Sequence, residues 1–198
     1  MANNYLRDVT VLIVDDQEFI HSLVRQMLRV LGCTKMIHAD NGDDAWQIVM
    51  NKPVDLVITD WYMEPVDGIE LTDRIRNNKL CPNPYLPVIM MSGFAERARI
   101  YGARDSGINE FVVKPLSARA LFGRIQNVIE HPRQFVRTQS FFGPDRRRRD
   151  KPIQDDRRGK GGSDDAPKPD MTADMKQDEV DAFLNPDSVP EEGDVAAD

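Results

Sequence analysis

The first two-thirds of this chain contain five short apolar runs. Each run is followed by a stretch that could form an amphipathic helix. The runs are rich in Val, Ile and Leu and have the length of strands; they are residues 9–14, 36–39, 54–59, 87–91 and 111–113. After them, apolar residues recur at three- and four-residue intervals, as on one face of an α-helix. Strands that lack polar alternation and alternate with helices are typical of a parallel sheet covered on both faces. The sequence therefore predicts an α/β fold of the doubly wound (βα)5 type, with a five-stranded parallel sheet.

The composition changes near Pro132. Residues 133–160 contain eight Arg, two Lys and four Asp, whereas residues 161–198 contain two Lys, nine Asp and three Glu. Segments rich in charge, Gly and Pro bury too little apolar surface to fold alone. We therefore expect a folded domain over 1–132, a basic Arg-rich segment over 133–160, and an acidic, flexible and largely disordered tail over 161–198.

The sequence also bears on location. No apolar run approaches the ~20 residues that a membrane span needs, and the polar N-terminus does not favour a secretory signal. Cys33 and Cys81 stand apart without a Cys-x-x-Cys pair, which favours two reduced thiols. The expected location is the cytoplasm, without membrane insertion.

Polar residues directly follow four of the five predicted strands. They are Asp15 and Asp16 after the first strand, Asp60 after the third, Ser92 after the fourth and Lys114 after the fifth. Singly, such an Asp is most often a turn former or a helix N-cap. In a parallel sheet, however, these positions meet at one edge, where ligands bind. The ordered set therefore favours a site.

The chemistry of this set points to phosphoryl transfer. Three carboxylates at one edge repel each other, and a hard divalent cation with oxygen ligands, here Mg²⁺, would relieve that repulsion. Asp60 would be the nucleophile, and Lys114 and the metal would neutralise the phosphoryl oxygens. Ser92 can donate a hydrogen bond to one of these oxygens.

The same residues lie in motifs that resemble the receiver domains of two-component response regulators, including the CheY type. The motifs are Val11-Leu-Ile-Val-Asp-Asp16, Thr59-Asp-Trp-Tyr-Met-Glu-Pro-Val-Asp-Gly68, Met91-Ser-Gly93 and Val113-Lys-Pro115. The resemblance covers about Val9 to His131 and implies a flavodoxin-like fold. In one departure from the common family pattern, the proline of the long motif is Pro65, five residues after Asp60 rather than four, but Gly68 stays in register.

The resemblance implies a role for each acid. Asp60 would be the phosphoacceptor. Asp16 and Asp60 would bind Mg²⁺ directly, together with the backbone carbonyl of Tyr62, and Asp15 would help hold the metal through water.

The resemblance also implies a switch. Ser92 and Lys114 would contact the phosphoryl oxygens, and Ser92 would move toward the phosphate while Phe111, three residues before the lysine, swings inward. Alternatively, Phe111 is plain strand core. The Lys114–Pro115 bond is expected to be cis, since an X-Pro bond adopts the cis form at the least cost.

Two aromatic residues bear on the lifetime of the phosphorylated state. Tyr62 lies two positions past Asp60, and Phe94 lies two positions past Ser92. In the family, side chains at these positions flank the path of the hydrolytic water. Two bulky aromatics would hinder that water without orienting it, which predicts slow autodephosphorylation.

The basic segment matches no output domain. It contains Phe135, Val136, Phe141 and Phe142, followed by arginines at 146–149. The favoured interpretation is a mostly solvated segment whose phenylalanines pack back on the domain. Docking to a protein partner is the second interpretation, and nucleic-acid binding is the unlikely third.

A second segment stands out near the end of the chain. Val180, Phe183 and Leu184 lie at i, i+3 and i+4, which predicts a short amphipathic helix near 174–184 that is marginal alone in water. The segment resembles the N-terminal peptide of flagellar switch proteins, which binds phosphorylated chemotaxis regulators. This likeness would imply docking on a receiver face, its own or another's; the alternative is an incidental amphipathic turn.

These features predict a phosphorylation-dependent signalling switch in chemotaxis-like or phosphorelay signalling. A histidine kinase or phosphotransfer protein would supply the phosphoryl group, and a downstream protein would bind the face formed by the fourth helix, fifth strand and fifth helix. The chain would be no enzyme apart from Mg²⁺-dependent self-phosphorylation and slow autodephosphorylation. The alternatives are a nucleic-acid-binding regulator that uses the Arg-rich segment, or a phosphate sink for a shared kinase.

Overall fold

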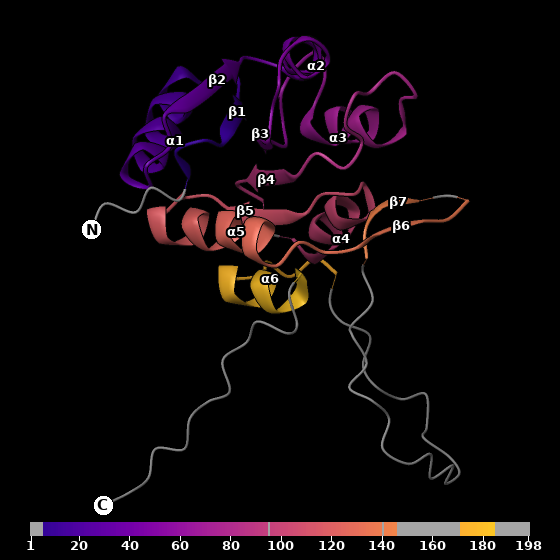
Figure 1. The fold of residues 1–198 in the computed structure, drawn as a ribbon. Helices are drawn as coiled ribbons and strands as arrows, with labels where there is room; N and C mark the ends of the chain where they lie inside the picture. Colours follow the sequence, from indigo (N-terminus) through magenta and orange to yellow (C-terminus); the bar gives the residue numbers. More distant parts are fainter. Residues whose placement is uncertain (1–5, 95, 140, 146–170, 185–198) are drawn as a thin grey trace, which may run out of the picture.

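A five-stranded parallel sheet forms the centre of the computed structural model, which describes residues 6–94, 96–139, 141–145 and 171–184 (Figure 1). The strands are β1 (Thr10–Val14), β2 (Lys35–Ala39), β3 (Leu56–Asp60), β4 (Val88–Ser92) and β5 (Glu110–Val113). Their order in the sheet is β2-β1-β3-β4-β5, and all neighbours are parallel. This order confirms the predicted doubly wound, flavodoxin-like fold.

Five helices connect or follow these strands. They are α1 (Glu18–Val30), α2 (Gly42–Asn51), α3 (Gly68–Asn77), α4 (Arg97–Asp105) and α5 (Ala118–Glu130). Side chains of Asn41, Asp67 and Ser117 cap α2, α3 and α5, because each accepts a hydrogen bond from a first-turn N–H. In the part of the chain that the structure describes, no helix is long and apolar enough to cross a membrane.

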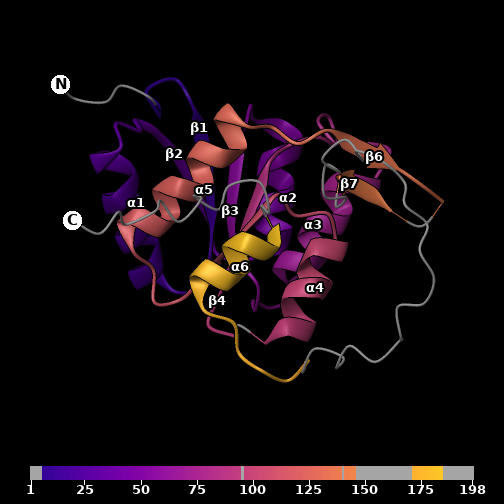
Figure 2. The same ribbon diagram turned by 90° about the horizontal axis from the view of Figure 1, so that it is seen from below.

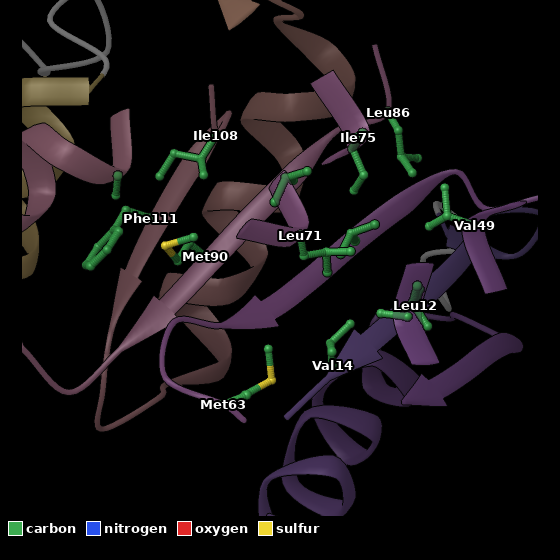
Figure 3. Packing of buried hydrophobic residues seen from close by; sticks show 14 of the residues in the cluster. Leu12, Val14, Val49, Met63, Leu71, Ile75, Leu86, Met90, Ile108 and Phe111 are labelled. Carbon is green, nitrogen blue, oxygen red and sulfur yellow. The ribbon is translucent and has the colours of Figure 1, made fainter. Parts of the chain in front are cut away.

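The sheet separates two apolar cores. Side chains of α1 and α5 pack on one face, and side chains of α2, α3 and α4 pack on the other (Figure 3 shows the second core). In β1, Val11 and Ile13 face the first core while Leu12 and Val14 face the second. Burial on both faces is the reason why the strands read as continuous apolar runs.

The fold continues past the compositional boundary at residue 132. Two short antiparallel strands, β6 (Phe135–Arg137) and β7 (Phe142–Pro144), follow α5. The rings of Phe135 and Phe142 lie 5.2 and 5.3 Å from the ring of Tyr85. The phenylalanines thus pack back on the domain, while the arginines at 146–149 lie outside the described residues.

A buried arginine joins this hairpin to the domain. Arg76 of α3 is almost fully buried and lies 5.1 Å from the centre of the Phe135 ring. Its guanidinium donates hydrogen bonds to the carbonyl oxygens of Gly107, Pro84 and Leu86 and to Asn109 Oδ1. Burial lowers the pKa of Arg76 to about 9, so the group still carries its charge at neutral pH and uses it in these bonds.

A sixth helix lies on the domain far from its neighbours in sequence. This helix, α6 (Gln177–Leu184), packs against β5; it lies below α4 and α5 in Figure 1 and between them in Figure 2. It falls within the range 174–184 in which a helix was expected. The tail was expected to be flexible over 161–198, but Met175, Val180 and Leu184 are buried against the domain, so this part of it packs on the receiver.

Candidate functional site

The polar residues predicted from the strand ends meet at one edge of the sheet. Asp15 directly follows β1, Asp60 ends β3, Ser92 ends β4 and Lys114 directly follows β5. The strand order reverses between β1 and β3, and ligands of such sheets bind outside the carboxyl ends at this point. The fold therefore places these side chains where a site is expected.

The three acids lie close enough to share one cation. Asp15, Asp16 and Asp60 each offer a carboxylate oxygen, and these oxygens lie within 4.8 Å of one another. Asp15 and Asp60 are buried, whereas Asp16 is exposed. Lys114 Nζ lies 2.9 Å from Asp60 Oδ1 and 3.1 Å from Asp15 Oδ2. One ammonium thus pairs with two of the three carboxylates.

Burial and charge act in opposite directions at the centre of the site. Burial raises the pKa of Asp60 above its usual range, and the hydrogen bond and charge of Lys114 oppose this shift only in part. For Lys114, burial would lower the pKa, but the hydrogen bond and charge of Asp60, and then those of Asp15, outweigh it and raise the pKa. Lys114 therefore stays protonated, and the buried carboxylates still favour additional positive charge.

The donor set fits a magnesium ion. Three carboxylates supply the hard oxygen ligands that Mg²⁺ prefers, and the exposed position of Asp16 leaves one side open to water. Among the described residues, no other group of three His, Cys, Asp or Glu side chains is placed in this way.

Gly68, the last residue of the longest motif, packs directly against the backbone of Asp60. A Cβ atom at Gly68 would clash with the backbone carbonyl oxygen of Asp60. The N–H of Gly68 also donates to the carbonyl oxygen of Trp61 at 2.9 Å, and the Thr59 hydroxyl donates to the Asp60 carbonyl at 2.9 Å. The loop after β3 therefore packs tightly against the backbone of Asp60, and only glycine fits at position 68.

A histidine that the sequence did not flag supports Asp15. His21 of α1 is buried, and its Nε2 donates to the backbone carbonyl oxygen of Asp15 at 2.6 Å. The Oδ1 atom of Asp15 accepts the N–H of Gln17 at 2.9 Å. A lone histidine on a helix gives no signal in the sequence that it holds a site residue in place.

Two of the predicted switch residues, Ser92 and Phe111, are buried. Ser92 Oγ accepts the N–H of Phe94 at 3.1 Å, and the carbonyl oxygen of Ser92 accepts the N–H of Lys114 at 2.8 Å. The Phe111 side chain is fully buried in the second core, near Met90 (Figure 3), and its ring lies edge-on to Trp61 with centroids 6.4 Å apart. The Lys114–Pro115 peptide bond is cis.

The two aromatics beside the site form a cluster with an arginine. The rings of Tyr62 and Phe94 lie edge-to-face 5.5 Å apart, and each side chain is about half exposed. The guanidinium carbon of Arg99 lies 4.7 Å from the Phe94 ring centre and 5.4 Å from that of Tyr62. Arg99 also pairs with Glu96 at 3.1 Å. The sequence missed Arg99 because nothing in its spacing links it to Tyr62.

Comparison with known proteins agrees with this fold and site. The family model described as "Response regulator receiver domain" matches residues 11–126, and the chain belongs to this family. The chain is 34% identical over 120 residues to chemotaxis protein CheY of Pseudomonas aeruginosa, and this alignment covers 61% of this chain and 95% of that protein. It is 33% identical over 124 residues to chemotaxis protein CheY-3 of Vibrio cholerae, and this alignment covers 63% of this chain and 94% of that protein.

The solved structures lead to the same class. A putative response regulator from Chloroflexus aurantiacus superposes with a TM-score of 0.58 at 26% identity, covering 63% of this chain and 100% of that one. Family membership supports a phosphorylation-dependent signalling role. The family match ends at residue 126, so the β6–β7 hairpin and α6 lie beyond it.

Proposed function

We propose that this chain is a response regulator that accepts a phosphoryl group on Asp60 from a histidine kinase or phosphotransfer protein and acts through protein–protein contact. The observation that carries this proposal is the position of Lys114 Nζ, within 3.1 Å of both Asp60 and Asp15, beside three converging carboxylates. A structural ion pair needs only two of these four groups.

Asp60 is the nucleophile in this proposal. One of its carboxylate oxygens attacks the phosphorus, and the bond between the phosphorus and the donor atom breaks as the acyl phosphate forms. Asp15, Asp16, Asp60 and the backbone carbonyl of Tyr62 would hold Mg²⁺, which supplies positive charge at the phosphoryl oxygens. Burial makes the Asp60 carboxylate more basic than usual, which favours its role as nucleophile.

Lys114 and Ser92 receive the new charge. Lys114 already donates to Asp60, so its ammonium lies close to where the phosphoryl oxygens form. The Ser92 hydroxyl accepts the N–H of Phe94 and keeps its own proton available for a phosphoryl oxygen. A shift of Ser92 toward the phosphoryl group would pull on the backbone that leads to Phe94 and α4.

The aromatic cluster supports a long-lived phosphorylated state. Tyr62 and Phe94 contact each other and Arg99, so neither ring is free to move aside independently. None of these three side chains is a carboxylate or amide that would orient a water molecule for attack. We propose slow autodephosphorylation for this reason.

A capture experiment tests the proposal. The full chain is immobilised with Mg²⁺, with and without beryllofluoride, and compared with Asp60→Asn under the same conditions. We expect a protein partner retained by wild type only with beryllofluoride, and no such dependence for Asp60→Asn. Equal retention by both proteins under all conditions would argue against a switch at Asp60.

A further inference from the structure

The N-terminus of α4 is completed by a segment that lies more than seventy residues later in the chain. Glu96, the N-cap residue of α4, makes no side-chain capping bond. Instead, the N–H of Arg97 donates to the carbonyl of Ala173, and that of Ala98 to the carbonyl of Met171, both at 3.2 Å. The first N–H groups of a helix lack partners within the helix. Residues 171–173 therefore supply the cap that the local sequence does not.

One glutamine side chain forms hydrogen bonds with the backbone at the outer edge of β5. Gln177 Oε1 accepts the N–H of Val113 at 2.7 Å, and Gln177 Nε2 donates to the carbonyl oxygen of Phe111 at 3.3 Å. β5 is the last strand of the sheet, and such an edge offers unpaired backbone groups to any suitable partner. The Gln177 amide matches them with one donor and one acceptor, as a neighbouring strand would.

Apolar contacts close the remainder of this surface. Met175, Val180 and Leu184 are buried and belong to the same cluster as Phe111 and Ile100. Val180 and Leu184 are four residues apart, so they lie on one side of α6. Figure 2 shows α6 lying between α4 and α5, on the face that these two helices form with β5.

Charge completes the match at the end of α6. Arg133 donates to the carbonyl oxygen of Leu184 and lies 3.8 Å from Glu110 Oε1 of β5. Glu110 is buried and pairs with Arg124 of α5 at 3.1 Å. A cation at the C-terminal end of a helix is favourable, and residues 171–184 carry four acids and one lysine.

We propose that residues 171–184 of this chain are a resident ligand of the face formed by α4, β5 and α5, and that they bind there more tightly when Phe111 is buried. The link from Phe111 to phosphorylation rests on the proposed function of Asp60. A downstream partner that uses this face must then displace residues 171–184.

The position of Phe111 couples the helix to the switch. The Phe111 ring is fully buried in the structure in which α6 is docked, and its backbone carbonyl is one of the two groups that Gln177 holds. Met175, Val180 and Leu184 belong to the same buried cluster as this ring, so an outward movement of the ring would disturb their packing. Binding couplings are reciprocal, so any change that favours the buried ring also favours docking of α6.

Amide hydrogen exchange on the full chain tests the docking directly. The N–H groups of Arg97, Ala98 and Val113 have acceptors in the segment 171–177, so their exchange reports on docking. We expect Val180→Asp to speed their exchange about tenfold or more, which corresponds to about 1.4 kcal/mol. Asp178→Asn changes an exposed side chain of the same helix, and we expect it to stay within about twofold of wild type.

The outcomes of this arm are distinct. Thermal unfolding of Val180→Asp establishes that the domain itself stays folded. Faster exchange confined to these three amides supports the resident ligand. Equal exchange in wild type and Val180→Asp would overturn it.

Beryllofluoride with Mg²⁺ tests the link to Asp60. We expect exchange at the three amides of wild type to slow about fivefold or more, with no slowing in Asp60→Asn or Val180→Asp. Unchanged or faster exchange in a wild-type chain that binds beryllofluoride would overturn the link. A chain that fails to bind beryllofluoride would instead overturn the proposed function and the link with it, whereas docking is judged by Val180→Asp alone.

Discussion

The contacts at the carboxyl end of β5 and those along its outer edge depend on different forces. At its carboxyl end, Lys114 holds together carboxylates that repel each other, and burial raises the pKa of Asp60. Along its outer edge, α6 is held by backbone hydrogen bonds and buried apolar side chains. The first region is poised to take up charge, whereas the second is already satisfied. In the proposed switch, charge gained at Asp60 would be read as a change in packing at Phe111, whose ring lies beside Trp61 and whose carbonyl oxygen accepts from Gln177.

Removal of Lys114 should have the largest effect on stability. Lys114→Ala leaves the buried carboxylates of Asp15 and Asp60 without their cation, and we expect the free energy of unfolding to fall by about 3 kcal/mol. Urea unfolding without Mg²⁺ measures this loss. The double variant with Asp60→Asn should lose less, because one of the two carboxylates is then neutral. A loss below about 1 kcal/mol would show that the pairs behave like exposed ones.

Neutralising Asp60 should change the stability in the opposite direction. Because burial raises the pKa of Asp60 in the folded state, its ionised form destabilises the fold at neutral pH. We expect Asp60→Asn to increase the free energy of unfolding by up to about 2 kcal/mol. The gain should shrink as the pH falls through the raised pKa, since wild-type Asp60 is then protonated. A variant less stable than wild type at neutral pH would contradict this reading of the site.

The aromatic cluster should control the lifetime of the phosphorylated state. The double variant Tyr62→Asn, Phe94→Glu removes both rings and introduces side chains that can orient water. We expect dephosphorylation to become about tenfold faster, a change of about 1.4 kcal/mol in the barrier. Tyr85→Ala removes an aromatic of the hairpin contact instead and should leave the rate unchanged. Rapid dephosphorylation of the wild-type chain would contradict the proposal of a long-lived phosphorylated state.

The smallest effect is expected at the C-terminal end of α6. Arg133→Gln removes the cation beside the Leu184 carbonyl but keeps a donor, so docking should weaken by about 0.5–1 kcal/mol. Exchange at the Val113 amide reports the change. Arg119→Gln alters an exposed arginine of α5 and serves as the matched control. Equal exchange in both variants would show that charge contributes nothing to docking.

The residues at the strand ends could be predicted from the sequence, whereas the contacts of α6 could not. Asp15, Asp60, Ser92 and Lys114 each lie at the end of an apolar run, so the parallel topology alone brings them together. The order of the strands and the burial of both sheet faces follow from the same pattern. The site could therefore be predicted without a structure.

The other region depends on contacts between distant segments. The spacing of Val180 and Leu184 predicted a helix but not its place, because Gln177 meets β5 only through backbone groups that every residue carries. Arg133 meets the end of α6 in the same way. The hairpin at 135–144 was hidden because Phe135 and Phe142 lie within a stretch of arginine, glutamine and glycine. Such contacts leave no periodic signal in the chain.

Phosphoryl incorporation measured by intact mass tests the central claim most directly. The full wild-type chain, given Mg²⁺ and acetyl phosphate, should gain one phosphoryl group per chain, located at Asp60 after reductive cleavage of the acyl phosphate. Asp60→Asn should gain none, and Asp16→Asn should gain far less than wild type because it lacks one metal ligand. Incorporation into Asp60→Asn at the wild-type level would contradict the assignment of Asp60 as the phosphoacceptor.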